Sequence, residues 1–192
     1  ILADKLTAFA PNTTGIPYSK GGFSTAMEII KQLYDVGNLF AEIRDVAAVA
    51  RTFQKIALTE MKYRGLTGGT AIVLNDIAKT ALCLATRGKA GAGNFAALQN
   101  GVSQIKAYIF SESYHIEKAI VYAARAAYLT KLIETGETSL VRFEEAGQVS
   151  SWSIEAPLDT RLNKLKKTNP EAFFYWYQVY LLSATGPAAA SP

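Results

Sequence analysis

Residues 86–98 read TRGKAGAGNFAAL, and this stretch decides between two folds. Gly91, Gly93 and Ala96 match G-x-G-x-x-A, the turn that lets a backbone approach a pyrophosphate at a helix N-terminus. A dinucleotide site of this kind needs a β-strand before the turn. The preceding segment instead has apolar residues at helical spacing, namely Ile77, Ala78, Ala81, Leu82 and Ala85. The stretch therefore predicts a joint between two helices.

The same stretch does not match the phosphate-binding loop G-x-x-x-x-G-K-[ST] of nucleotide hydrolases. Gly88 and Lys89 are followed by Ala90, and Cys83 stands where the first glycine is required. The backbone amides ahead of Asn94 and two basic side chains remain available to an anion. We therefore expect Arg87 and Lys89 to contact nucleic-acid phosphates without forming a nucleotide site.

Working outward from this joint, the rest of the chain predicts an all-α fold, a helical bundle with an extended N-terminal arm. The arm covers residues 1–23, where five prolines and glycines interrupt any long helix: Pro11, Gly15, Pro17, Gly21 and Gly22. A helical domain follows over residues 24–186, and residues 187–192 form a loose C-terminal tail. The length of 192 residues suits one domain of this kind.

Cap residues and glycines set the expected helix boundaries. Thr25 and Glu28 form a capping box that begins the first helix, and Gly37 ends it. The pattern Asn169-Pro170-Glu171 begins the last helix. Helices are predicted over residues 25–37, 38–64, 70–86, 94–110 and 113–136, over a short basic segment from Pro157, and over residues 169–186. Residues 139–154 have a different texture, which predicts one short β-hairpin.

Composition limits the possible chemistry. The only cysteine, Cys83, lies on an apolar helix face and is expected in the core, which excludes an internal disulfide or a multi-cysteine metal site. Glu112 and His115 have the E-x-x-H spacing of di-iron bundles, but such a site needs a second histidine, which this chain lacks. Ser111 and Ser113 lie close to His115 without a predictable carboxylate partner. We predict no enzymatic activity, no metal and no cofactor.

The positive signals are basic surfaces. On the predicted helix 38–64, Arg44, Arg51, Lys55 and Lys62 fall within about 40° of one another at 100° per residue. They span about 27 Å at 1.5 Å per residue, a length over which several phosphates of a duplex could be neutralised. The alternative is a solvated charged face without a ligand. The net charge of +4 is compatible with either interpretation.

A second basic cluster is followed directly by an aromatic helix. The cluster comprises Arg161, Lys164, Lys166 and Lys167, and we expect it to contact nucleic acid, with an anionic membrane surface as an alternative. The stretch FFYWYQVYLL is apolar all round, so it is predicted to be buried, in the core or against another subunit. Base stacking is the alternative role for these aromatics. The predicted interface residues are Phe173, Phe174, Tyr175, Trp176, Tyr177 and Tyr180.

This organisation resembles the major coat proteins of filamentous archaeal viruses. The resemblance rests on the arm through GIPYSKGGFST, the stripe in EIRDVAAVARTFQKIALTEMKYRG, and FFYWYQVYLL. It implies a virion protein that wraps double-stranded DNA together with copies of itself or a paralogous coat subunit, with no catalytic residues. The expected function is thus a structural protein of a helical nucleoprotein. The alternative is a non-enzymatic helical subunit of an intracellular protein or ribonucleoprotein complex.

Overall fold

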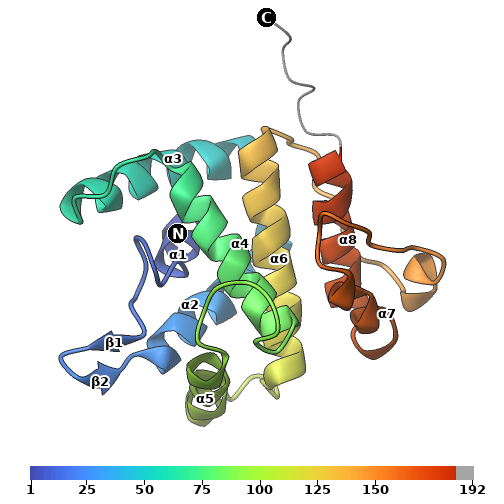
Figure 1. Ribbon diagram of the computed structural model, residues 1–192, viewed down its shortest axis with the longest axis horizontal. Helices are drawn as coiled ribbons and strands as arrows, with labels where there is room; N and C mark the ends of the chain where they lie inside the picture. The colour runs from blue at the N-terminus through green and yellow to red at the C-terminus, as the bar shows by residue number, and fades with distance from the viewer. Residues whose placement is uncertain (185–192) are drawn as a thin grey trace, which may run out of the picture.

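The computed structural model describes residues 1–184, and eight α-helices make up most of that part of the chain (Figure 1). The predicted all-α helical bundle is confirmed. The helices are α1 (Leu2–Ala8), α2 (Ala26–Leu39), α3 (Val46–Tyr63), α4 (Ala71–Ala85), α5 (Phe95–Ile105), α6 (Ile116–Thr135), α7 (Leu165–Thr168) and α8 (Pro170–Ala184). A two-stranded antiparallel sheet pairs β1 (Ser19–Lys20) with β2 (Phe23–Ser24).

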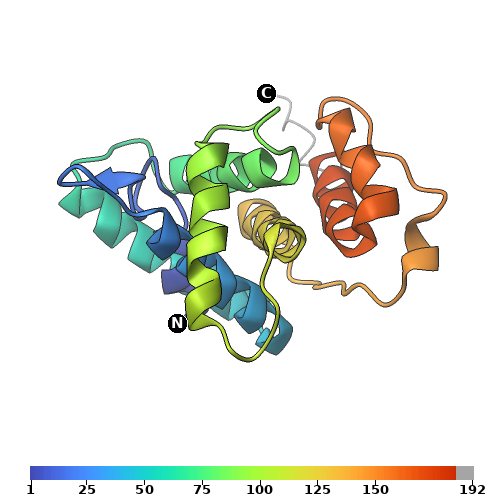
Figure 2. The same cartoon turned by 90° about the horizontal axis from the view of Figure 1, so that it is seen from below.

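Helix α6 lies at the centre of the bundle, with α2 and α4 on one side and α8 on the other (Figure 2). Its sequence suits this place because small residues recur around the helix and let neighbours approach closely. The buried alanines are Ala119, Ala123, Ala124, Ala126 and Ala127. The helix begins after His115 and ends at Gly136, whose φ of 72° gives the left-handed conformation common at helix C-termini.

The expectation of an extended N-terminal arm is wrong for the first ten residues. Helix α1 packs against α2 and α3, and Leu6, Phe9 and Ala10 are fully buried. Pro11 and the glycines exclude a long helix, but they leave room for two turns before Pro11. The part of this segment that projects from the bundle is the β1–β2 hairpin (Figure 1).

The boundary predicted at Gly37 is also wrong. Helix α2 continues through Gly37 because the missing side chain makes room for a ring of α6: a Cβ there would lie 2.0 Å from Cγ of Tyr122. Helix α2 ends two residues later, at Leu39, and α3 begins after Asp45. The carboxylate of Asp45 accepts a hydrogen bond from the Ala48 amide (2.9 Å) and caps α3. Arg44 therefore lies outside the helix that was predicted to carry it.

The predicted capping box at the start of α2 does not form. Thr25 is the cap residue, but its hydroxyl donates to the carbonyl of Pro17, and no side-chain oxygen of Thr25 accepts from the first turn of α2. The hydrogen bond from Thr25 to Pro17 instead connects the start of α2 to the segment before the hairpin.

The hairpin predicted over residues 139–154 is wrong as well. This segment contains no strand; Phe143 packs on Phe174 of α8 (5.7 Å between ring centroids), and the chain then forms the short 3-10 helix η3 (Ala146–Val149). Its backbone bonds to tyrosine side chains instead of a second strand. The Val141 amide donates to the Tyr128 hydroxyl (3.1 Å), and the Phe143 amide donates to the Tyr175 hydroxyl (3.4 Å).

The end of the chain is partly as predicted. The basic segment from Pro157 forms the 3-10 helix η4 (Thr160–Lys164), which continues into α7. Helix α8 begins at Pro170, as the Asn-Pro-Glu pattern predicts. Its predicted end at Gly186 and the predicted tail 187–192 lie outside the described residues.

Candidate nucleic-acid interface

The joint between α4 and α5 is a helix-to-helix connection, as predicted. Residues 80–85 lie in α4, so the strand that a dinucleotide site requires is absent from this segment. Gly91 folds back onto α4: its φ is 81°, and a Cβ there would lie 2.3 Å from the Lys79 carbonyl oxygen. The glycines thus serve close packing between the joint and α4. Asn94 caps α5 by accepting from the Ala97 amide (3.0 Å), as its position predicts.

Helix α4 ends in a Schellman motif with an unusual residue at its centre. The Gly88 amide donates to the Cys83 carbonyl (2.8 Å), and the Arg87 amide donates to that of Leu84 (3.1 Å). In this motif the residue corresponding to Arg87 is left-handed and is usually glycine. Arg87 has a φ of 52°, and it is the only non-glycine residue with positive φ within residues 1–184. The backbone conformation directs a guanidinium to this corner at a cost of about 1–2 kcal/mol.

The structure brings the basic joint and the basic segment of η4 together. Arg87 and Lys89 of the joint line a hollow of about 270 Å³ together with Arg161 and Lys164 of η4. Thr86, Glu117 and Thr168 also line it. We call this the basic hollow. Four cations that the sequence places in two remote segments thus surround one cavity of a size that a phosphate group fits.

Two of these four cations already have carboxylate partners. Arg87 forms an ion pair with Glu117 of α6, and Arg161 Nη1 lies 2.9 Å from Asp159 Oδ2. Lys89 and Lys164 form no ion pair with any residue of 1–184. The net charge of the hollow is therefore positive, and the two lysines are its uncompensated groups.

The remaining predicted cations do not join this hollow. Lys167 is exposed on α7, and the Lys166 ammonium lies over the Phe173 ring, 5.4 Å from its centroid. Arg51, Lys55 and Lys62 are exposed along α3, with Arg51 Nη2 at 4.0 Å from Asp45. Arg44 is exposed in the bend before α3. Because α3 and α7 lie at opposite ends of the molecule, the basic residues form two separate surfaces (Figures 1 and 2).

The predicted aromatic interface lies largely inside the chain. Phe173, Phe174, Tyr175 and Trp176 are buried, with Tyr175 stacked on Tyr128 of α6 (5.9 Å between centroids). These four residues are core residues of the monomer, which corrects their assignment to an interface with another subunit. Tyr177 and Tyr180 are only partly buried, and Tyr177 stacks on Trp152 (4.5 Å).

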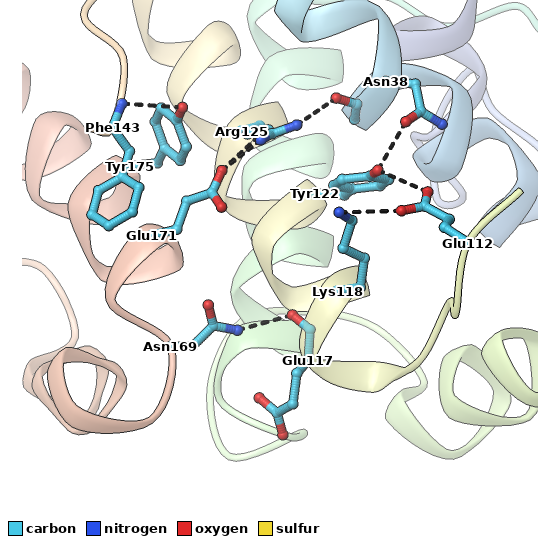
Figure 3. Close-up of polar contacts among 11 residues, drawn as sticks. Asn38, Glu112, Glu117, Lys118, Tyr122, Arg125, Phe143, Asn169, Glu171 and Tyr175 are labelled. Carbon is cyan, nitrogen blue, oxygen red and sulfur yellow. Dashed lines mark hydrogen bonds and ion pairs between the residues drawn. The ribbon is translucent and has the colours of Figure 1, made fainter. Parts of the chain in front are cut away.

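A polar network fixes α8, and with it η4, against α6 (Figure 3). Arg125 donates to the Glu171 carboxylate (3.1 Å from Nε) and to the Gly37 carbonyl (2.8 Å), so one side chain joins α2, α6 and α8. Lower on α6, Asn169 donates to the main-chain carbonyl of Glu117 (2.9 Å). These bonds hold the segment that carries Arg161 and Lys164 at a fixed position relative to Arg87. The sequence offers no signal for this network, since its members are widely separated.

Glu112 and His115, the two residues with di-iron spacing, have different surroundings. Glu112 is bonded to the Tyr122 hydroxyl (3.2 Å) and to Lys118 (3.2 Å), while His115 is exposed at the start of α6. Burial raises the pKa of the Cys83 thiol, which lies in the core as predicted. Within residues 1–184 no group of three acidic, histidine or cysteine side chains could hold a metal ion. In the same range, every helix is too short or too polar to cross a membrane.

No protein-family model, curated protein or solved structure matches this chain. The chemistry of the basic hollow therefore follows from its own residues. Sequence reasoning identified all four of its cations and the acidic residue Asp159 beside Arg161, but it identified neither the convergence of the cations nor Glu117 as the partner of Arg87. One pattern in the sequence does indicate the position of Arg87. The pair Arg87-Gly88 follows an apolar helical pattern, and a Schellman motif commonly forms at such a helix end.

Proposed function

We propose that this protein is a non-enzymatic structural protein that binds nucleic acid through its phosphate backbone and packages it as a coat-like subunit. The observation that carries the proposal is the left-handed Arg87, which lines a hollow together with Lys89, Arg161 and Lys164. A backbone conformation that disfavours arginine is retained where it adds a cation to a positive site. The groups present are donors and charges, which suit phosphate contacts.

The second basic surface supports the same function. Arg51, Lys55 and Lys62 extend over about 16 Å of α3 at 1.5 Å per residue. Because this surface and the basic hollow are separated, one molecule has two places to contact a polyanion. A protein with two separated sites can join two segments of nucleic acid or two turns of a duplex, as a packaging subunit must. Double-stranded DNA is the polyanion that we propose.

Binding measured against ionic strength tests this function. A fluorescent 30-base-pair duplex is titrated with protein at several salt concentrations. Because each neutralised phosphate releases a counterion, we expect log K to fall linearly with log salt, with a slope of about −0.9 per contact. The variant Lys89→Glu/Lys164→Glu should weaken binding at least about tenfold and make the slope shallower by about 2.

A matched control uses Lys106→Glu, which reverses an exposed cation outside both surfaces. It should change affinity little, because screening limits the effect of a remote charge. The variant Arg51→Glu/Lys55→Glu/Lys62→Glu measures the share of α3. Wild-type affinity that does not change with salt would contradict the proposal. Electron microscopy of the protein with long duplex DNA then tests packaging, which predicts regular nucleoprotein particles.

A second candidate function is a helical subunit that docks on a protein partner. It is favoured by two exposed aromatics, Tyr108 (69% exposed) and Phe110 (93% exposed). Tyr108 lies at an apolar hollow of about 330 Å³ that also includes Met27, Ile105 and Ile109. A chain that remains a monomer by sedimentation and shows no salt-dependent affinity for DNA would favour this candidate over the first.

A further inference from the structure

We propose that the carboxylate of Glu117 is a built-in competitor of phosphate, which occupies Arg87 in the free protein and sets the affinity of the basic hollow. The inference rests on the proposed function, since it concerns the regulation of the same site. Glu117 forms an ion pair with Arg87 and lines the hollow with it. A phosphate that enters the hollow meets a guanidinium that is already bound by a carboxylate. Carboxylate and phosphate both bind arginine through charge-assisted hydrogen bonds, so the two anions compete for Arg87.

The structure separates two roles of Glu117. Its main-chain carbonyl accepts a hydrogen bond from Asn169 (2.9 Å) and so ties α6 to the start of α8 (Figure 3). Its side chain makes the ion pair with Arg87. The first contact does not depend on the side-chain chemistry. The carboxylate can therefore be removed without removing the bond that positions η4 and α7.

The Arg87–Glu117 pair is placed where it can exchange. Its side chains are 48% and 39% exposed. Exposed pairs stabilise a protein little, because water solvates both charges well and the side chains lose freedom on pairing. The guanidinium can leave Glu117 for a phosphate at small cost. The strained backbone fixes the position of Arg87, and its ion pair with Glu117 is weak. Arg87 is therefore a positioned cation that a phosphate can take over from Glu117.

Asp159, the carboxylate that pairs with Arg161, is held more firmly than Glu117. Asp159 accepts from the Arg161 amide (2.8 Å) and pairs with the Arg161 side chain (2.9 Å). It is the cap of η4, so its removal would disturb the turn that carries Arg161 and Lys164. This difference identifies Glu117 as the displaceable anion and makes it the residue to change.

The test compares Glu117→Gln with wild type in the duplex titration across salt concentrations. Freed from its carboxylate, Arg87 becomes available to a phosphate. We expect about three- to fivefold tighter binding at low salt, because the phosphate no longer has to displace a carboxylate from Arg87. The variant Glu117→Ala removes the same carboxylate and should give the same gain in affinity. It tests the inference even if Glu117→Gln does not fold. Circular dichroism confirms the helical fold of each variant.

Two controls separate local competition from a change in net charge. Glu134→Gln removes an exposed carboxylate from another ion pair, with Lys131 (2.9 Å), and should leave affinity and slope close to wild type. Combining Glu117→Gln with Arg87→Ala should abolish the gain, because the effect acts through Arg87. If Glu117→Gln and Glu134→Gln behave alike while wild type binds DNA with a salt-dependent affinity, the inference is wrong and the proposed function stands. If wild type shows no salt-dependent affinity, both fall.

Discussion

Arg87 shows how a single residue can trade stability for charge. It occupies the left-handed position of the Schellman motif that ends α4, with a φ of 52°, where glycine has no steric cost. Arg87 also lines the basic hollow, so a conformation that costs the folded state free energy places a basic residue at this surface. Natural sequences keep such a local conflict where function requires it.

We predict that two substitutions of Arg87 affect DNA binding equally and stability differently. Arg87→Gly and Arg87→Ala both remove the guanidinium and its ion pair with Glu117, so DNA affinity should fall to the same extent in each. Only glycine relieves the backbone, so Arg87→Gly should be more stable than Arg87→Ala by about 1 kcal/mol in urea unfolding. Equal stability of the two variants would show that the left-handed conformation is not costly here. Affinity retained in both would remove Arg87 from the interface.

At the scale of elements, local patterns predicted helices well and their ends less well. The start of α8 at Pro170 and the cap of α5 at Asn94 follow from residues within one turn of each boundary. Gly37 reads as a helix end, yet α2 passes through it because the Tyr122 ring of α6 needs the space. That requirement comes from a residue far along the chain. No local pattern contains it.

The basic hollow could likewise be predicted only in part from the sequence. The cations could be found because charge is visible in the sequence. Their meeting could not, because it depends on how Arg125 joins Glu171 to the Gly37 carbonyl and so holds α8 against α6. The aromatic helix was recognised as buried, but the burying surface proved to be α6 of the same chain.

The joint between α4 and α5 yields a prediction about packing. Gly91 and Gly69 both have left-handed φ values, 81° and 76°, so alanine is strained at either position. They differ in space: a Cβ at Gly91 would lie 2.3 Å from the Lys79 carbonyl oxygen, whereas a Cβ at Gly69 meets no heavy atom within 4 Å among the described residues. Gly91→Ala should therefore lower the free energy of unfolding by about 1–3 kcal/mol more than Gly69→Ala, through overpacking.

Thermal or urea unfolding of the two alanine variants measures this difference. The matched backbone strain cancels, so what remains is the contact between the joint and α4. Equal losses would mean that the joint moves away from α4 without cost. In that case the position of Lys89 in the basic hollow would not depend on Gly91.

At the scale of the whole molecule, the core is built around tyrosine hydroxyls. Burial raises the pKa of five tyrosines that lie along the bundle, with smaller contributions from neighbouring charges and hydrogen bonds: Tyr18, Tyr114, Tyr122, Tyr128 and Tyr175. Most of these hydroxyls also bond elements together, as Tyr122 does with Asn38 (2.8 Å). For Tyr114, no hydrogen-bond partner is found within residues 1–184. The stability of the fold is therefore linked to the protonation of these groups.

The sign of this linkage predicts loss of stability in alkali. An unfolded tyrosine releases its proton with a pKa near 10, whereas the buried hydroxyls hold theirs to higher pH. Above pH 10 the unfolded chain therefore binds fewer protons than the folded one, and the free energy of unfolding falls as pH rises. The contribution is complete below pH 10. Each such tyrosine adds up to about 1.4 kcal/mol per pH unit to the slope.

Urea unfolding from pH 8 to 11 of wild type, Tyr114→Phe and Tyr122→Phe separates titration from hydrogen bonding. Both variants should show a shallower alkaline slope, because each removes one titrating group. At pH 8, Tyr122→Phe should lose about 1 kcal/mol with its hydrogen bond, whereas Tyr114→Phe should keep or gain stability because a buried hydroxyl without a partner costs free energy. Comparison of each variant with wild type cancels the contributions of all unchanged groups. A wild-type stability that stays level through pH 11 would contradict the prediction, because it would mean that the folded chain holds these protons no more tightly than the unfolded chain.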